Sequence, residues 1–175
     1  MEKAEKISSL IKIINAAKKD ISDLIDRPSN IQSIGEGIAA DILGINYEDT
    51  APHLTRKGYF CKGPLKNKSV TIEWYLTKYS CINQLYNVDF VVLMVGLDKY
   101  YRTPYEYPSP WLINSVYLLN LRPVLDEIDW IEKGQVVDIH IKNEEWKGLE
   151  IFPESNSPLM ELSEEQKNMF RKFSG

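Results

Sequence analysis

The N-terminal segment carries apolar side chains at helical spacing. They recur at i, i+3, i+4 and i+7, with lysines and acids on the other face, which predicts one amphipathic helix. The apolar positions are Ile7, Leu10, Ile11, Ile14, Ala17, Ile21 and Leu24. Pro28 follows this stretch, and because proline disfavours a helical conformation in the residue before it, the helix is expected to end there.

A second helix is predicted over residues 30–43. Ser29 or Asn30 can cap its start, and Gly44 stands where helices commonly end. Glu36 lies off the expected apolar stripe, between two glycines, which indicates close approach by another part of the chain. The stripe is expected to comprise Ile31, Ile34, Ile38 and Ile42.

Residues 69–77 alternate strictly between apolar and polar positions, as a half-buried β-strand requires. Its only charged side chain is Glu73, on the polar face. The apolar face is formed by Val70, Ile72, Trp74 and Leu76. The polar face is formed by Thr71, Glu73, Tyr75 and Thr77.

The rest of the chain predicts a mixed sheet. The strand expected over residues 89–97 is continuously apolar after Asp89, which is typical of a central strand covered on both faces. Ser163 and Gln166 form a capping-box pattern that opens a last helix ending near Phe173. Shorter strands are expected over residues 57–61, 112–120 and 135–142, and a short helix over residues 122–131. The element order predicts an α/β (α+β) fold with a mixed central sheet flanked by helices.

Chain length and composition fit one globular domain over residues 1–175. Its expected parts are N-terminal helices over 3–43, a sheet core over 55–142 and a C-terminal helix over 163–173. Cys61 and Cys81 lack a metal-ligand spacing, so we expect reduced thiols. The start of the chain has no signal-peptide pattern, and no apolar run reaches membrane-span length. We therefore expect a cytoplasmic protein without a membrane partner.

Positive charge is concentrated in one segment of an acidic chain. Residues 51–80 hold six bases and one acid, which gives +5 and leaves −9 for the remainder of a chain whose total is −4. The bases are Arg56, Lys57, Lys62, Lys66, Lys68 and Lys78. Such asymmetry is typical of a patch that faces a polyanion such as DNA. The alternative is a solvated, lysine-rich loop with no partner.

The chain lacks the glycine-rich phosphate-binding motifs and GxSxG, and its two histidines, His53 and His140, have no zinc-ligand spacing. Carboxylates and lysines remain as candidate chemistry. Phosphodiester hydrolysis commonly uses Mg²⁺ held by two or three carboxylates, with a lysine nearby. Glu36 and Glu73 are the candidate catalytic and Mg²⁺-binding residues if they converge. The alternative is that each is an ordinary surface acid.

Several short motifs also indicate a family. Along the chain they are Asn30-Ile-Gln-Ser-Ile-Gly-Glu36 with Leu43-Gly44, Lys57-Gly58-Tyr59, Gly63-Pro64-Leu65, Ser69-Val70-Thr71-Ile72-Glu73-Trp74-Tyr75, Asp89-Phe90-Val91-Val92-Leu93, Trp111-Leu112-Ile113, and Trp146 followed by Glu150-Ile151-Phe152-Pro153. Together they resemble an uncharacterised bacterial family of restriction-endonuclease-like proteins. The resemblance implies the PD-(D/E)XK nuclease core, a mixed sheet flanked by helices.

The same resemblance carries over to individual positions. Glu36 matches the family's helix glutamate, whereas the metal-binding aspartate falls at Phe60 and the catalytic lysine falls at Glu73. It therefore implies a nuclease-like domain that binds nucleic acid with lost or weak phosphodiesterase activity.

Two alternatives stay open. One is an active Mg²⁺-dependent restriction or defence endonuclease with a shifted site. In that enzyme Lys78 or Lys68 supplies the positive charge, or Glu73 binds the metal together with Asp49 or Glu48. The other is a non-enzymatic, immunity-type protein that binds a protein partner through its acidic surface, for which the tyrosine- and proline-rich residues 100–111 are suited.

Overall fold

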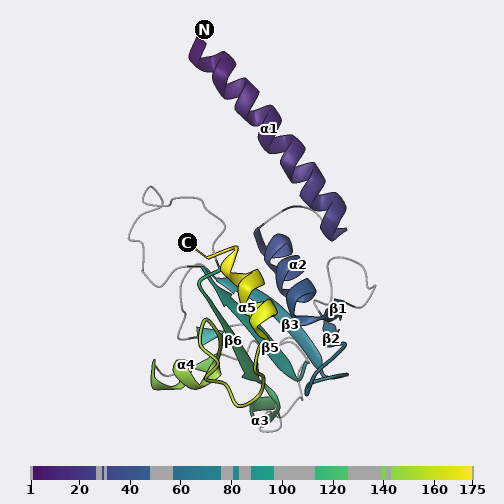
Figure 1. Cartoon of the computed structure of the whole chain (residues 1–175), viewed down its shortest axis with the longest axis vertical. Coiled ribbons are helices and arrows are strands. Elements are labelled where there is room, and N and C mark those ends of the chain that lie inside the picture. Colours follow the sequence, from purple (N-terminus) through teal and green to yellow (C-terminus); the bar gives the residue numbers. More distant parts are fainter. Residues whose placement is uncertain are drawn as a thin grey trace, which may run out of the picture.

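The computed structural model describes residues 2–26, 29, 31–47, 57–75, 81–82, 88–96, 113–125, 139–140 and 143–174. Both predicted N-terminal helices are present, as α1 (Glu2–Ile25) and α2 (Ile31–Leu43). Helix α1 projects away from the rest of the molecule (Figure 1). None of the described helices combines the length and the apolar composition that a membrane span needs.

A six-stranded mixed sheet forms the centre of the molecule, in the order β1-β2-β3-β5-β6-β8. Strands β3 and β5 run parallel, with Ile72 opposite Val92, and every other neighbouring pair is antiparallel. The strands are β1 (Ile45–Tyr47), β2 (Gly58–Phe60), β3 (Ser69–Tyr75), β5 (Phe90–Val95), β6 (Ser115–Asn120) and β8 (Glu150–Phe152). A separate two-stranded sheet pairs β4 (Cys81–Ile82) with β7 (Ile139–His140). The predicted mixed α/β architecture is confirmed.

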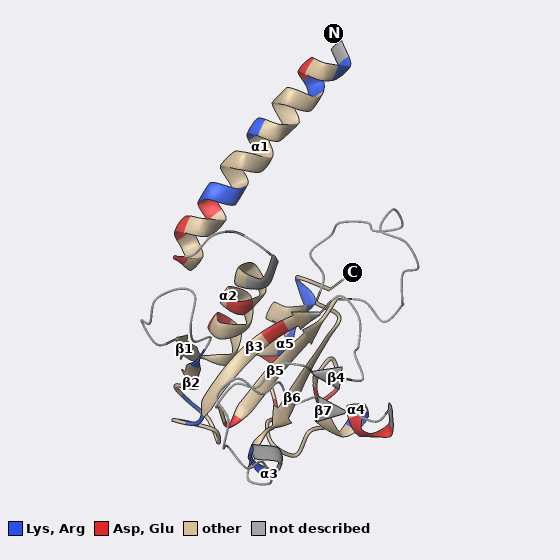
Figure 2. Ribbon diagram, turned by 180° about the vertical axis from the view of Figure 1, so that it is seen from behind, with Lys and Arg blue, Asp and Glu red and all other residues tan. Residues whose placement is uncertain are grey.

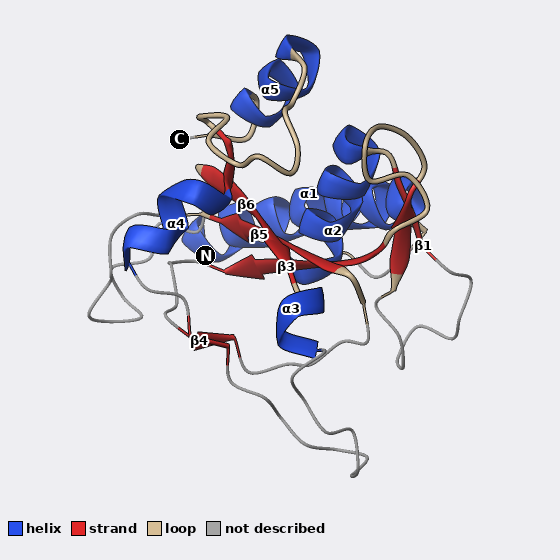
Figure 3. Cartoon of the chain, turned by 90° about the horizontal axis from the view of Figure 1, so that it is seen from below, coloured by secondary structure: helices blue, strands red, loops and turns tan. Residues whose placement is uncertain are grey.

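Helices cover both faces of the large sheet. On one face, α2 and α5 (Glu164–Arg171) pack on the side of Val70, Ile72 and Val92. On the other face, Trp146 of α4 (Asn143–Leu149) makes an edge contact with Tyr117, with ring centroids 4.8 Å apart. Figure 3 shows α2 and α5 on one side of the sheet and α3 (Arg122–Leu125) on the other. Strand β5 is buried at every residue, as predicted for a central strand.

The predicted burial pattern of α2 is confirmed only in part. Ile42 is buried and Ile38 packs against the core, but Ile34 and Ile38 are only partly buried. Glu36, predicted off the stripe, is 2% exposed and lies on the buried face with Ala39 and Leu43. Hydropathy ranks isoleucine above the small residues, but it is small residues such as Ala39 that let a helix come close to a sheet. The predicted close approach is confirmed at Gly37, where an added Cβ would lie 2.8 Å from the Ile25 side chain.

Other boundaries differ in detail. The predicted capping box of α5 is present, with reciprocal bonds between Ser163 and Gln166. Strand β1, helix α4 and strand β8 were not predicted, because segments this short hold too few residues to display a period. Residues 76–77 of the predicted strand, most of the helix over 122–131 and most of the strand over 135–142 lie outside the described residues.

Candidate nucleic-acid interface

The loop between β2 and β3, residues 61–68, presents lysines on a fixed backbone. Its backbone bonds include Asn67 N to Phe60 O at 2.8 Å and Lys68 N to Leu65 O at 2.9 Å. The Leu65 side chain is buried in the core. Asn67 and Gly63 have φ of 67° and 76°, a left-handed conformation that asparagine and glycine adopt most readily. The backbone of the loop is therefore fixed by its own hydrogen bonds, which sets the positions from which its exposed side chains project.

Three exposed lysines, Lys62, Lys66 and Lys68, stand on this loop, and Lys57 precedes β2. The stem of Lys62 crosses Gly44, where an added Cβ would lie 2.7 Å from its Cε atom. The Lys57 ammonium lies 5.3 Å from the centroid of the Tyr59 ring, within cation–π range. The segment thus combines positive charge with a partly exposed aromatic ring.

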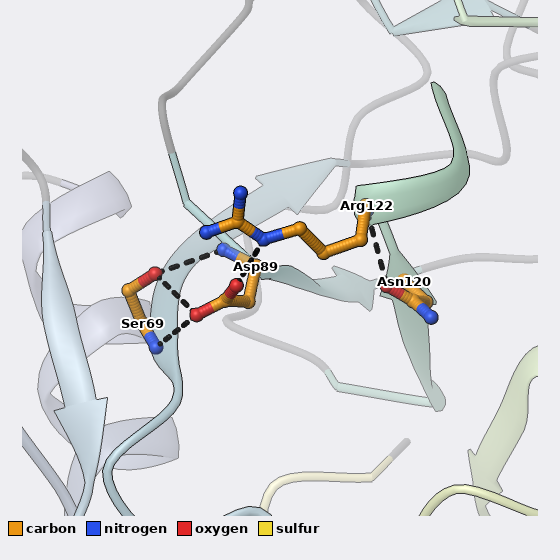
Figure 4. Close-up of polar contacts among 4 residues, drawn as sticks. All are labelled: Ser69, Asp89, Asn120 and Arg122. Atoms are coloured by element: carbon orange, nitrogen blue, oxygen red, sulfur yellow. Dashed lines mark hydrogen bonds and ion pairs between the residues drawn. The ribbon is translucent and has the colours of Figure 1, made fainter. Parts of the chain in front are cut away.

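A hydrogen-bonded cluster around Asp89 joins this loop to the rest of the sheet (Figure 4). The Ser69 backbone N–H and hydroxyl donate to Asp89 Oδ2 at 2.9 and 2.8 Å. Arg122 Nε donates to Asp89 Oδ1, and the Leu121 N–H donates to the Asp89 carbonyl at 2.8 Å. The Arg122 N–H in turn donates to Asn120 Oδ1 at 3.1 Å. These bonds tie together the starts of β3 and β5 and the end of β6.

The environment of Asp89 keeps its carboxylate ionised. Burial alone would raise its pKa, but the hydrogen bond from Arg122, the bonds from Ser69 and the charge of Arg122 together lower the pKa below its ordinary value. The Arg122 side chain is about half exposed, so part of its guanidinium faces solvent. Asp89 and Arg122 were not singled out from the sequence. The available signal was that Ser69 and Asp89 both stand where a predicted strand begins.

We call Lys57, Lys62, Lys66, Lys68 and Arg122 the basic edge. Lys68 is next to Ser69, whose bonds to Asp89 lead directly to Arg122, so Lys68 and Arg122 flank the starting ends of β3 and β5. Figure 2 shows the positive segments at the β2–β3 loop and at α3. No acid occurs between residues 57 and 69. Of the other predicted nucleic-acid-binding residues, Arg56 and Lys78 lie outside the described residues.

The two candidate catalytic carboxylates belong to different layers. Glu73 is 5% exposed and pairs with Leu93 in register, so its side chain projects to the sheet face that α4 covers. Glu36 lies on α2, which packs on the opposite face. The sheet therefore separates the helix that carries Glu36 from the face to which Glu73 points.

This arrangement does not fit the expected Mg²⁺ site. A Mg²⁺ site built from both carboxylates needs them to meet at one point. Here Glu73 projects from β3 to one face of the sheet, whereas Glu36 lies on the helix that packs on the other face. Within the described part of the chain, no group of three or more His, Cys, Asp or Glu residues is arranged to hold a metal. Asp49, Glu48 and Lys78, which the shifted-site alternatives use, lie outside the described residues.

The basic edge can therefore attract a polyanion, and Tyr59 offers a ring on which a base can stack. Asp89 and Arg122 form an ion pair with no net charge, so the net positive charge of the basic edge is that of its four lysines. The sequence matches no protein-family model and no curated protein, and the structure matches no solved structure.

Proposed function

We propose that this chain is a nucleic-acid-binding domain, built on a restriction-endonuclease-like core, whose phosphodiesterase activity is weak or lost. DNA is the proposed ligand. The basic edge is the feature that supports this proposal most. Its lysines are exposed on a hydrogen-bonded loop, in a chain whose overall charge is −4. Positive charge held at one edge of an acidic molecule directs a polyanion to that edge.

The chemistry of the edge suits a nucleic-acid backbone. Each lysine that neutralises a phosphate releases a condensed counterion, and this release supplies most of sequence-independent binding. Arg122 adds a guanidinium beside the lysines, held in place by Asp89. Tyr59, already under the Lys57 ammonium, can stack on a base of a single strand.

The surroundings of the candidate catalytic positions support weak or lost cleavage. Phe60, where the resemblance places a metal-binding aspartate, is fully buried, and its ring centroid lies 6.2 Å from that of Phe90. Glu73, where the resemblance places a lysine, is an acidic residue and is buried. Two of the three family positions therefore lack the required side chain, and Glu36 lies in the layer on the other side of the sheet.

The binding half of the proposal is tested with labelled duplex and single-stranded DNA by fluorescence anisotropy. The variant Lys62→Gln/Lys66→Gln/Lys68→Gln removes three charges from the basic edge. The control Lys12→Gln/Lys147→Gln/Lys172→Gln removes three charges that are also exposed but lie elsewhere, so the change in net charge is the same. At about 0.1 M salt, the edge variant is expected to bind DNA at least tenfold more weakly than the native protein. The control variant is expected to bind DNA with nearly the native affinity. Equal weakening of both variants, or no binding by the native protein, would overturn the proposal.

The catalytic half is tested separately. Plasmid and single-stranded DNA are incubated with Mg²⁺ or Mn²⁺ and the native protein, Glu36→Gln or Glu73→Gln. The expected result is little or no cleavage by any of them. Robust cleavage by the native protein that both substitutions abolish would contradict lost activity and favour the shifted-site endonuclease.

A further inference from the structure

Helix α1 leaves a continuous apolar stripe in solvent. It has 24 residues, so it is about 36 Å long at the usual rise per residue. Every side chain from residue 3 to residue 20 is exposed. The large apolar side chains that are at least half exposed are Ile7, Leu10, Ile11, Ile13, Ile14 and Leu24.

Packing of α1 within the described part of the molecule is confined to its C-terminal end. There Ile25 lies against Gly37, and the Ser29 N–H donates to Ser22 Oγ at 2.9 Å. Helices in proteins owe most of their stability to tertiary packing of an apolar face, and monomeric proteins seldom expose large contiguous apolar patches. The free part of α1 therefore needs a partner surface.

The spacing of the apolar stripe indicates what kind of partner surface it fits. When the residues are assigned to a heptad repeat, position a holds isoleucine three times and position d holds leucine, alanine and leucine. The a residues are Ile7, Ile14 and Ile21, and the d residues are Leu10, Ala17 and Leu24. β-Branched residues at a with leucine at d favour a two-stranded coiled coil. The partner surface is thus a second helix with a matching seam.

We propose that α1 pairs with α1 of a second copy of this chain, so that the protein is a homodimer held by a short two-stranded coiled coil. The six exposed side chains present roughly 600 Å² of apolar surface per copy, so full pairing buries about 1,200 Å², the lower end of the range for specific protein interfaces. Ile11 and Ile13 flank the seam and widen it beyond the a and d positions.

The charges of α1 favour a second copy over a lipid surface. The helix carries five lysines and four acids. Helices that lie on membranes usually have a polar face rich in lysine and arginine, which this nearly balanced face is not. Two such helices can approach without strong mutual repulsion.

The test is the molar mass of the full chain in solution, measured by sedimentation velocity over a concentration series. The native protein is expected to move from about 20 kDa to twice that mass as the concentration rises. Ile14→Lys places one lysine per chain in the seam and should raise the dimer dissociation constant at least tenfold, because these ammonium groups lose water on pairing. Ala16→Lys adds the same charge two residues away on the opposite face of the helix, and should leave the dimer unchanged.

A native protein that stays monomeric throughout the series would overturn the proposal, as would equal effects of Ile14→Lys and Ala16→Lys. Far-UV circular dichroism of both variants at matched concentration checks that the body remains folded. Flotation with anionic vesicles tests whether the stripe binds a lipid surface. A monomeric native protein that floats with the vesicles, when Ile14→Lys does not, would assign the stripe to a lipid surface instead.

Discussion

Removing the Asp89 carboxylate should destabilise the sheet more than removing an ordinary acid. Asp89 accepts two hydrogen bonds from Ser69 and one from Arg122, and its side chain is 13% exposed. A hydrogen bond to a charged group contributes about 1.5–3 kcal/mol when it is buried. The ion pair with Arg122 is worth less than about 1 kcal/mol because that arginine is half exposed.

From these values, Asp89→Asn should lower the free energy of unfolding by about 2 kcal/mol, since the amide keeps one acceptor for Ser69 but loses the charge. Asp89→Ala should cost about 3 kcal/mol or more, because both Ser69 donors then lose their shared acceptor Oδ2 and Arg122 loses Oδ1. Glu154→Gln is the control, since Glu154 is an exposed acid and its removal should change stability by less than about 0.5 kcal/mol. Urea unfolding, followed by circular dichroism at neutral pH, measures all three.

The stability difference between the native protein and Asp89→Asn should depend on pH in a defined direction. The folded-state pKa of Asp89 is lowered, so its ionised form stabilises the fold above the unfolded-state pKa, and that contribution is lost as the pH falls through the folded-state pKa. The gap between the native protein and Asp89→Asn should be constant between about pH 5 and 8 and shrink below about pH 4. A gap that persists unchanged to pH 3, or Asp89→Asn as stable as the native protein at pH 7, would refute this account of the cluster.

Two further predictions concern the scaffold and are measured as free energies of unfolding. Gly58→Ala should destabilise the protein by about 1–3 kcal/mol, because the new Cβ would lie 2.9 Å from the backbone carbonyl oxygen of Asn46. Gly148→Ala, where a Cβ on α4 meets open space, should stabilise the protein by about 0.5–1 kcal/mol. The reverse order of stabilities would contradict this geometry. Ser163→Ala should cost about 1 kcal/mol through loss of the α5 capping box, whereas Ser163→Asp should retain most of the stability; equal losses in both would show that the cap contributes nothing.

The elements that were predictable from sequence are those with local signals. Strand β3 alternates, β5 is continuously apolar, and the α5 start has a capping box within four residues. Strands β1 and β8 exist through pairing with distant partners, Ile45 opposite Phe60 and Val116 opposite Phe152. With three residues each, β1 and β8 hold no period of their own and the sequence does not reveal them, whereas the equally short β2 was predicted within residues 57–61.

The candidate site also has features that were predictable from sequence and features that were not. Charge counting located the lysines of the basic edge, because a cluster within one loop is visible in the sequence. The contact between Asp89 and Arg122 joins residues 33 positions apart and depends on how β5 and β6 pair. The separation of Glu36 from Glu73 depends on which sheet face α2 covers, and hydropathy misassigned the buried face of that helix.

The salt dependence of DNA binding by the native protein and the triple edge variant tests the central claim most directly. Each phosphate neutralised in duplex DNA contributes about 0.9 to the slope of log K against log salt concentration. If Lys62, Lys66 and Lys68 each neutralise a phosphate, the slope of the edge variant should be smaller by about 2–3, and that of the Lys12/Lys147/Lys172 control should match the native slope. Identical slopes for the native protein and the edge variant would contradict the claim that this edge binds nucleic acid.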